Sequence, residues 1–423
     1  MKILFKRIEK PDYKPDIKSY LKNSDFKALK KALRMKPEDI LNEIKKSGLV
    51  GRGGAGFPTG LKWESAYKTQ DFPKYVVCNA DEGEPGTFKD RIILEKDPHS
   101  IIEAMIICAY TIKAKCGFIY IRGEYFKAYE VLKKAIKEVE AYGFLGENIL
   151  DSNFSFKIFL YKGAGSYVCG EETALLDSLE GRKGQSRIKP PFPTFVGFKN
   201  KPTVLNNVET LANIPHIILK GGEWFSKIGS KNSPGTKLYC LSGDIKKPGV
   251  YELPTNVTLR DLIYKYAGGP KGKIKVILPG GVSSPVLLKK DLDVIMDYKE
   301  VEKKGSMLGS GAVIVINEKR CIVDINKRIL DFFNYESCGR CAPCREGIKR
   351  AKEILEFISE AKADLSDLEL LKELQEVLFD TSRCGLGQAA LNCVRSSIDK
   401  FYEEFKEHIV EKRCKVGVCR VGR

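Results

Sequence analysis

Three closely spaced cysteines near the carboxyl end form the sequence pattern with the clearest chemical meaning. The segment Ser337–Arg345 holds Cys338, Cys341 and Cys344 in the spacing C-x2-C-x2-C. Gaps of two residues let one tight loop direct three thiolates at a single centre, which is typical of three corners of a 4Fe–4S cube. We assign the fourth corner to Cys384, just before the last predicted long helix, because a helical bundle would bring it back to the loop. The pattern therefore predicts an iron–sulfur site.

Zinc and structural thiols are the alternatives for these cysteines. Structural zinc sites usually show two C-x2-C pairs, whereas this sequence has one triple and a single cysteine, which favours iron–sulfur. Cys393, nine residues after Cys384, is a rival fourth ligand. Cys414 and Cys419 could hold another metal ion, but we expect free thiols on a basic, frayed carboxyl terminus. The other cysteines are expected to be small core residues: Cys78, Cys108, Cys116, Cys169, Cys240 and Cys321.

A glycine-rich segment, Gly51–Gly56, matches the dinucleotide pattern G-x-G-x-x-G. Its context is not that of an ordinary Rossmann site, because it follows a helix-like stretch and runs into Pro58, which would disturb a helix interior. Glycines still let backbone amides line a flat ligand closely. Arg52 and Lys62 add positive charge for phosphates or for an anionic ring. A plain glycine-rich turn is the alternative.

Two further segments follow predicted strands, where ligands meet open α/β sheets. Gly163–Gly170 lacks the Gly-Lys-Ser/Thr of a phosphate-binding Walker loop. Asn79–Gly86 carries the carboxylates of Asp81, Glu82 and Glu84, which are costly to bury without partners. Ribose or ribityl hydroxyls would supply the missing donors. An exposed acidic turn is the alternative.

The surrounding elements predict three kinds of structure. After a helical, basic stretch of about 45 residues, strands alternate with helices, which predicts a mainly parallel α/β sheet. The strands are expected at 74–79, 118–122 and 156–162, and the helices at 98–115 and 125–141. A small α+β region follows, with strands at 237–242, 250–253 and 274–278 and a helix at 258–268. From Ser337 onward we expect a bundle of three helices: one at 346–363, one that carries Leu368–Leu378 and begins with a capping box of Ser366 and Glu369, and one at 388–410.

Composition limits the classes of protein. No apolar run reaches membrane-spanning length and no signal peptide is visible, so we expect a cytoplasmic protein without membrane insertion. The odd count of 13 cysteines argues against a disulfide framework. The net charge of +17 would fit nucleic acid, but lysines and glutamates are interspersed and no nucleic-acid-binding motif is present. A solvated Lys/Glu surface explains the charge better, and part of it could offset dinucleotides, an anionic cluster or an acidic partner.

Together these segments resemble the 51-kilodalton-type flavoprotein of respiratory complex I over nearly the whole chain. The similar stretches are GRGGAGFPTGLKW, CNADEGEPG, GAGSYVCGEE, KPPF, NNVETL and the loop SCGRCAPC with Cys384. The resemblance implies a modified Rossmann-like domain for FMN and NADH at 1–236, a ubiquitin-like β-grasp domain at 237–329 and an iron–sulfur helical bundle at 330–423. One departure is that Glu64 and Ser65 follow Trp63 where an aromatic residue is expected.

The resemblance also implies roles for individual residues. The residues implied to contact FMN are Gly51, Arg52, Gly53, Lys62, Asn79, Asp81, Gly170, Glu171, Asn206 and Asn207. Those implied on the NADH side are Phe57, Glu82, Glu84, Tyr167, Glu172, Lys189 and Phe192. Glu82, Glu84 and Glu172 would be the catalytic carboxylates. Phe57 and Phe192 can stack on adenine, and Glu172 would disfavour NADPH by repelling its 2′-phosphate.

The implied reaction is hydride transfer from NADH to FMN, followed by single-electron transfer to the 4Fe–4S cluster. The implied assembly is a hetero-oligomer with a 24-kilodalton-type 2Fe–2S subunit and a large iron–sulfur subunit, in a peripheral arm on the cytoplasmic side of the inner membrane. A diaphorase subunit of an NAD-linked hydrogenase or formate dehydrogenase is an alternative. A non-catalytic iron–sulfur relay and a zinc-containing nucleic-acid-binding protein are alternatives from other classes.

Overall fold

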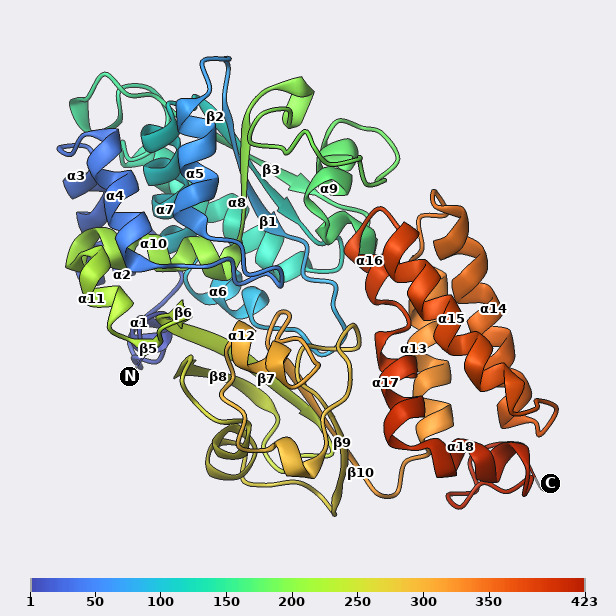
Figure 1. Ribbon diagram of the computed structural model, residues 1–423. Coiled ribbons are helices and arrows are strands. Elements are labelled where there is room, and N and C mark those ends of the chain that lie inside the picture. The colour runs from blue at the N-terminus through green and yellow to red at the C-terminus, as the bar shows by residue number, and fades with distance from the viewer. Residues whose placement is uncertain (1, 422–423) are drawn as a thin grey trace.

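The computed structural model of the chain describes residues 2–421, and Figure 1 shows two sheets and a helical bundle meeting side by side. The first sheet and its helices occupy the amino-terminal half. The second sheet lies below them in the view, and the bundle lies to the right. The predicted α/β fold, followed by a small α+β part and a carboxyl-terminal helical bundle, is confirmed. Within the described residues, no helix has the length and apolar character that a membrane crossing needs.

The first sheet has four parallel strands in the order β3-β2-β1-β4. They are β1 (Tyr75–Ala80), β2 (Cys116–Ile121), β3 (Lys157–Lys162) and β4 (Thr203–Asn207). Three of these strands lie within two residues of their predicted positions, whereas β4 was not predicted. Because parallel strands end at one edge, the loops that follow β1, β3 and β4 are brought together there.

Helices cover both faces of this sheet. The most buried is α7 (Pro98–Ile112), which is apolar on nearly all sides, as expected of a helix enclosed by other elements. The remaining helices of this part are α1 (Phe5–Ile8), α2 (Ile17–Asn23), α3 (Lys27–Ala32), α4 (Pro37–Ser47), α5 (Thr59–Lys68), α6 (Asp90–Lys96), α8 (Phe126–Ala141), α9 (Glu172–Leu179), α10 (Val208–Lys220) and α11 (Gly222–Ser226).

The second sheet has the strand order β8-β7-β10-β9. Its members are β7 (Thr236–Gly243), β8 (Gly249–Pro254), β9 (Ile274–Leu278) and β10 (Ala312–Asn317). The central pair β7 and β10 is parallel and both edge strands are antiparallel, which is a β-grasp arrangement. A short hairpin, β5 (Gly229–Ser230) with β6 (Ser233–Pro234), precedes it, and α12 (Tyr298–Lys303) lies before β10. The predicted helix at 258–268 is shorter, at Asp261–Tyr266.

The carboxyl-terminal bundle begins immediately after β10. Its helices are α13 (Ile322–Glu336), α14 (Ala342–Ser359), α15 (Ser366–Thr381), α16 (Gly385–Ala389), α17 (Asn392–Lys400) and α18 (Tyr402–Ile409). The single helix expected at 388–410 is wrong, because the chain turns after Ala389 and again near Phe401 to wrap the bundle. The expected capping box is also wrong: Ser366 is the first residue of α15, and Asp364 accepts its backbone N–H at 2.9 Å.

Candidate functional site

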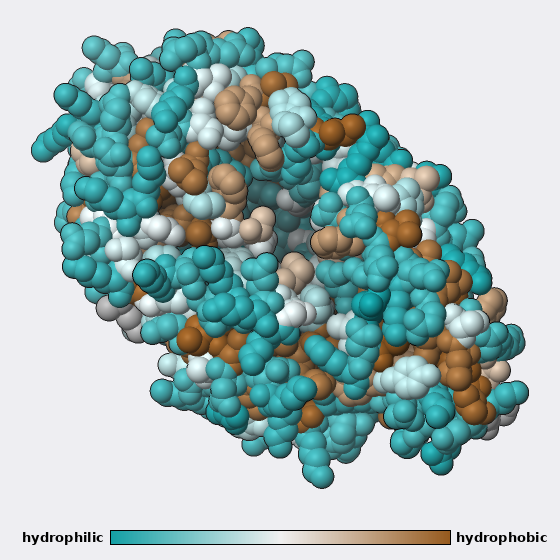
Figure 2. Space-filling view, in the orientation of Figure 1, coloured by the Kyte–Doolittle hydropathy of each residue, from teal (hydrophilic) through white to brown (hydrophobic). Residues whose placement is uncertain are grey.

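The loops at the carboxyl edge of the first sheet contact one another as the sequence predicted. Asn79, at the end of β1, donates from Nδ2 to the carbonyl of Gly170 at 2.9 Å. Its Oδ1 accepts the backbone N–H of Asp81 at 3.1 Å. One amide side chain therefore joins the acidic turn to the second glycine-rich segment. Figure 2 shows that this face of the molecule is hollowed near its centre, between the first part and the bundle.

Asp81 is a buried carboxylate whose hydrogen-bonding capacity is unused. Neither of its oxygens has a partner among the described residues. Its pKa is raised to about 7, chiefly by burial; Arg122 opposes the rise, and Glu124 and Glu336 add to it. A buried acceptor without a donor is costly, and hydroxyl groups of a bound ligand would remove that cost. Asp81 thus fits the ribityl or ribose chain of a nucleotide cofactor.

A chain of four alternating charges lies beside this turn. Lys62 Nζ is 3.1 Å from Glu172 Oε2, and Lys189 Nζ is 2.8 Å from Glu171 Oε1 and 3.5 Å from Glu172 Oε1. Glu171 also caps α9, because its Oε2 accepts the backbone N–H groups of Thr173 and Ala174 at 2.9 Å. Burial alone would raise the pKa of Glu172, but Lys62 and Lys189 hold it below its usual value. Glu172 is therefore an anion at neutral pH.

The end of β4 supports the first glycine-rich loop. Asn206 Oδ1 accepts the indole N–H of Trp63 at 2.7 Å, and Asn207 caps α10 by accepting the Glu209 N–H at 3.0 Å. A Cβ at Gly53 would lie 3.1 Å from the Asn207 Cβ. That approach is closer than most side chains allow, so glycine at position 53 lets the loop lie against β4. Gly51 is fixed by Tyr298, whose hydroxyl donates to its carbonyl at 2.8 Å.

The position of the Arg52 side chain contradicts the expectation that it supplies positive charge to a ligand. Its guanidinium is fully buried and donates to Ser233 Oγ at 2.8 Å and to the Pro234 carbonyl at 2.5 Å. The buried carboxylate of Glu209 lies close enough to act as its counter-charge. Arg52 therefore anchors the loop to the hairpin β5–β6. The sequence could not distinguish this inward direction from an outward one.

The other two carboxylates of the acidic turn, Glu82 and Glu84, already accept hydrogen bonds within the protein. Glu82 accepts the backbone N–H groups of Lys89 and Asp90 at 2.9 Å and the Tyr125 hydroxyl at 2.8 Å, so it holds the start of α6. Burial and Asp90 raise its pKa to about 7. Glu84 accepts the Tyr167 hydroxyl at 2.5 Å and the Ser283 hydroxyl at 2.8 Å. Glu84 therefore joins the first sheet to the β-grasp part.

Two aromatic side chains of the expected nicotinamide-dinucleotide side remain open to solvent. Phe57 is 52% exposed and Phe192 is 50% exposed. Exposed phenylalanine rings are available to stack on a flat ligand such as adenine. Phe192 follows Lys189, the last lysine of the charge chain, by three residues in the sequence.

The cysteines predicted to hold the cluster lie together where the bundle meets the first part. Cys344 is buried, and Cys338, Cys341 and Cys384 are near enough to act on its thiol electrostatically. A Cβ at Gly387 would lie 3.2 Å from Cys344 Cβ, so the start of α16 packs against the loop. Cys393 lies within α17, is fully buried, and has Ser397 as its hydrogen-bonding neighbour. Four converging thiols fit a 4Fe–4S cluster.

The cysteines predicted to hold the cluster also lie close to the loops that follow the strands of the first sheet, called the ligand loops below. Cys384 lies within electrostatic range of Glu171. Tyr167 donates its backbone N–H to Glu336 Oε2 at 2.8 Å, and its ring meets Phe332 edge-on at 5.1 Å between centroids. Glu336 is the last residue of α13, directly before the cysteine loop. The loops after the first sheet and the helical bundle thus contact each other beside the residues predicted to bind the two cofactors.

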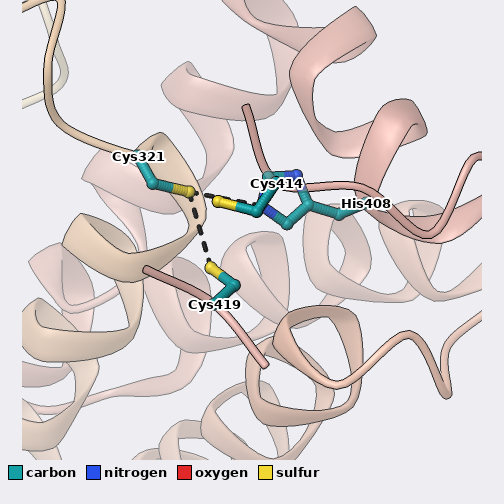
Figure 3. Close-up of side chains that lie close together, drawn as sticks. All are labelled: Cys321, His408, Cys414 and Cys419. Atoms are coloured by element: carbon teal, nitrogen blue, oxygen red, sulfur yellow. Dashed lines mark hydrogen bonds between the residues drawn. The ribbon is translucent and has the colours of Figure 1, made fainter. Parts of the chain in front are cut away.

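A second group of cysteines was missed. Cys321, His408, Cys414 and Cys419 place their ligand atoms within 4.8 Å of one another (Figure 3). Cys321 is a buried core residue as expected, but it also belongs to this group. The expectation of a frayed carboxyl terminus is wrong for the described residues up to 421. Cys419 and Val421 are buried, and the Arg420 N–H donates to the Ser359 carbonyl at 3.0 Å. The available signal was the sequence H-x5-C-x4-C, which needs a distant fourth ligand.

The fold and these sites define a class: an α/β flavoprotein joined through a β-grasp module to an iron–sulfur bundle. Comparison of the sequence with family models agrees. Residues 44–216 match the Nuo51 FMN-binding domain, residues 238–286 the SLBB domain, and residues 324–408 the NADH-ubiquinone oxidoreductase-F iron–sulfur binding region.

Similar proteins identify the family. The chain is 48% identical to the F 2 subunit of NADH-quinone oxidoreductase of Rhizobium meliloti, over 97% of this chain and 98% of that protein. It is 47% identical to the F subunit of the Aquifex aeolicus enzyme (96% and 94%) and 48% identical to the HndC subunit of the NADP-reducing hydrogenase of Solidesulfovibrio fructosivorans (95% and 82%). A chain of the NAD+-reducing [NiFe]-hydrogenase superposes with a TM-score of 0.83 at 35% identity, over 93% of this chain and 66% of that one. This chain belongs to the NADH-quinone oxidoreductase F-subunit family, with FMN- and 4Fe–4S-binding regions.

Proposed function

We propose that this chain is the electron-entry subunit of an NADH:quinone oxidoreductase. The observation that carries the proposal is the contact between the ligand loops and the cysteine loop, through Glu171, Tyr167 and Cys384. When bound, FMN supplies a group that accepts a hydride and releases electrons singly to the cluster. Cys338, Cys341, Cys344 and Cys384 are proposed to hold that cluster.

The residues of the first part are proposed to bind and orient the two nucleotides. The backbone can approach FMN closely at three glycines, Gly51, Gly53 and Gly170. Polar groups for FMN come from Asn79, Asp81, Asn206 and Asn207. Lys62 and Glu171 are proposed to contact FMN and Glu172 and Lys189 the dinucleotide, and Phe57 and Phe192 stack on its adenine. Arg52 contributes to FMN binding by fixing the loop, since its guanidinium is buried elsewhere.

We propose that Glu82 and Glu84 help to place the nicotinamide by holding neighbouring groups in position. Each holds several donors, so neither has a free carboxylate for proton transfer. Glu84 also fixes Tyr167, which stands between the dinucleotide side and α13. Hydride transfer needs no general acid or base, and these two carboxylates keep the acidic turn and its neighbours in one geometry.

The proposed partners are a 24-kilodalton-type 2Fe–2S subunit and a large iron–sulfur subunit, in a peripheral arm on the cytoplasmic side of the membrane. Support comes from large apolar side chains exposed near the cysteine loop: Tyr335 at 85%, Phe379 at 56% and Val377 at 48%. Figure 2 shows hydrophobic surface on the bundle. Large exposed apolar side chains on the bundle are what a partner subunit would cover.

A hydrogenase-linked diaphorase is the second candidate. It is favoured by the 48% identity to the NADP-reducing hydrogenase chain, which equals the identity to the Rhizobium meliloti quinone-oxidoreductase chain. Affinity purification of the chain from its own cells would separate the two: quinone-oxidoreductase subunits are expected, and co-purifying hydrogenase subunits would establish the alternative.

NADH oxidation itself can be tested on the purified chain loaded with FMN and iron. NADH should reduce a one-electron acceptor such as ferricyanide, and the rate should disappear when FMN is removed and return when it is added. An activity that does not depend on FMN would refute the proposal.

The buried Asp81 predicts a pH dependence of FMN affinity. Without ligand its pKa is raised to about 7, whereas ribityl hydroxyls donating to the carboxylate would lower it. The bound state then holds fewer protons than the free state. FMN affinity should therefore rise as pH increases toward 7 and level off above it. Titration of apoprotein by quenching of flavin fluorescence at pH 5.5 to 8 measures this, and Asp81→Asn should remove most of the slope. An equal slope in the variant would exclude Asp81 as its source.

A further inference from the structure

The cysteine and histidine side chains in Figure 3 come from two distant parts of the chain. Cys321 lies in the junction between β10 and α13, His408 lies in α18, and Cys414 and Cys419 lie in the segment that follows. Cys321 Sγ is 3.3 Å from His408 Nε2 and 3.6 Å from Cys419 Sγ. His408, Cys321 and Cys419 are at most 5% exposed. None of these cysteines forms a disulfide in the described structure.

These distances match the edges of a metal-ligand tetrahedron. Bonds of about 2.3 Å from zinc to sulfur and about 2.0 Å to nitrogen give edges of about 3.8 Å between sulfurs and about 3.5 Å between sulfur and nitrogen. The four ligand atoms all lie within 4.8 Å of one another, so they can surround one ion. A two-iron cluster would need its ligand pairs farther apart, because an iron–iron separation lies between them.

Hydrogen bonds with neighbouring groups orient His408 as a metal ligand. Its Nδ1 lies 2.7 Å from the Glu404 carbonyl, which is an acceptor, so Nδ1 carries the proton and Nε2 presents a lone pair to the sulfurs. Metal-binding histidines almost always show this second hydrogen bond. The Glu404 carboxylate in turn accepts the Ile322 N–H at 2.9 Å and pairs with Lys275 of β9 at 2.7 Å. Glu404 thus holds both the His408 ring and the backbone next to Cys321.

We propose that Cys321, His408, Cys414 and Cys419 form a closed structural zinc site. Three thiolates and one imidazole are a common set for structural zinc and leave no open position for a substrate. The site is separate from the iron–sulfur loop, because Cys321 precedes α13 and Cys338 follows it, and this 15-residue helix is about 22 Å long. Zinc here would fasten the carboxyl-terminal segment to the junction between the β-grasp part and the bundle.

Metal analysis of the intact chain tests the proposal. Inductively coupled plasma mass spectrometry should find about one zinc ion per chain beside the iron, and the zinc absorption edge should show three sulfur ligands and one nitrogen ligand. Cys419→Ser and His408→Ala should each lower zinc at least roughly tenfold. His408→Cys should retain it. Cys393→Ser is the matched control, since Cys393 is buried in the same bundle but lies outside the group.

The unmodified protein alone can contradict the proposal, whether or not a variant folds. Absence of zinc, or iron bound at these four residues, would overturn it. A disulfide between Cys321 and Cys419 in freshly purified chain would do the same. Alkylation followed by mass spectrometry gives an independent readout: Cys321, Cys414 and Cys419 should be protected until a strong chelator removes the metal, and equal labelling with and without chelator would count against zinc.

Discussion

Cys384→Ser is expected to remove the iron–sulfur cluster and to abolish NADH-driven reduction of the downstream acceptor. Four thiolates hold a 4Fe–4S cube, and Cys384 is the one that joins it to α16 and to the ligand loops. Iron should fall from about four atoms per chain to a small residue, and acceptor reduction should fall at least roughly 100-fold. Iron analysis and a steady-state assay measure the two effects.

Cys393→Ser is the control for this prediction. Cys393 is nine residues further along and fully buried, but it lies within α17 beside Ser397. Its variant should keep both iron and activity. FMN content should be unchanged in both variants, which separates loss of the cluster from loss of the fold. Iron lost from Cys393→Ser and retained in Cys384→Ser would reverse the ligand assignment.

Glu172→Gln is expected to relax the preference for NADH over NADPH. Lys62 and Lys189 keep Glu172 ionised, and an anion at this point would repel the 2′-phosphate of NADPH. The variant leaves both lysines without this partner, so repulsion changes to attraction. The ratio of kcat/KM for NADH to that for NADPH should fall roughly 10- to 100-fold, which corresponds to about 1.4 to 2.8 kcal/mol.

The matched control is Glu223→Gln, which breaks an exposed ion pair with Lys227 on the surface of α11. It should leave the ratio unchanged. If Glu172→Gln lowers kcat/KM equally for the two dinucleotides, the carboxylate positions the substrate without discriminating between them. A ratio equal to that of the unchanged protein, with kcat/KM also unchanged, would rule out both roles.

Much of the fold followed from local patterns in the sequence. Strands β1, β2 and β3 each centre on a short run of apolar residues, and their positions were predicted within two residues. The strand β4 was missed because its residues 203–207 end in two asparagines, which are unfavourable in isolated strands. Its pairing with β1 places those asparagines at the sheet edge, and only the tertiary structure provides that reason.

Side-chain direction was the least predictable part of the site. Arg52 and Lys62 are both basic residues beside glycines, yet Arg52 points inward to Ser233 while Lys62 reaches Glu172. The sequence also identified the C-x2-C-x2-C loop because its ligands are local. It did not reveal the group of Cys321 with His408, because their separation of 87 residues is closed only by the path of α13 to α18.

Electron paramagnetic resonance of the whole chain after anaerobic addition of NADH tests the central claim most directly. With FMN bound, NADH should produce the signal of a reduced 4Fe–4S cluster. Without FMN, the same cluster should stay oxidised under NADH but be reduced by dithionite. A cluster that NADH reduces equally well in the absence of FMN, or never reduces in its presence, would contradict the account of this chain as an entry point for electrons.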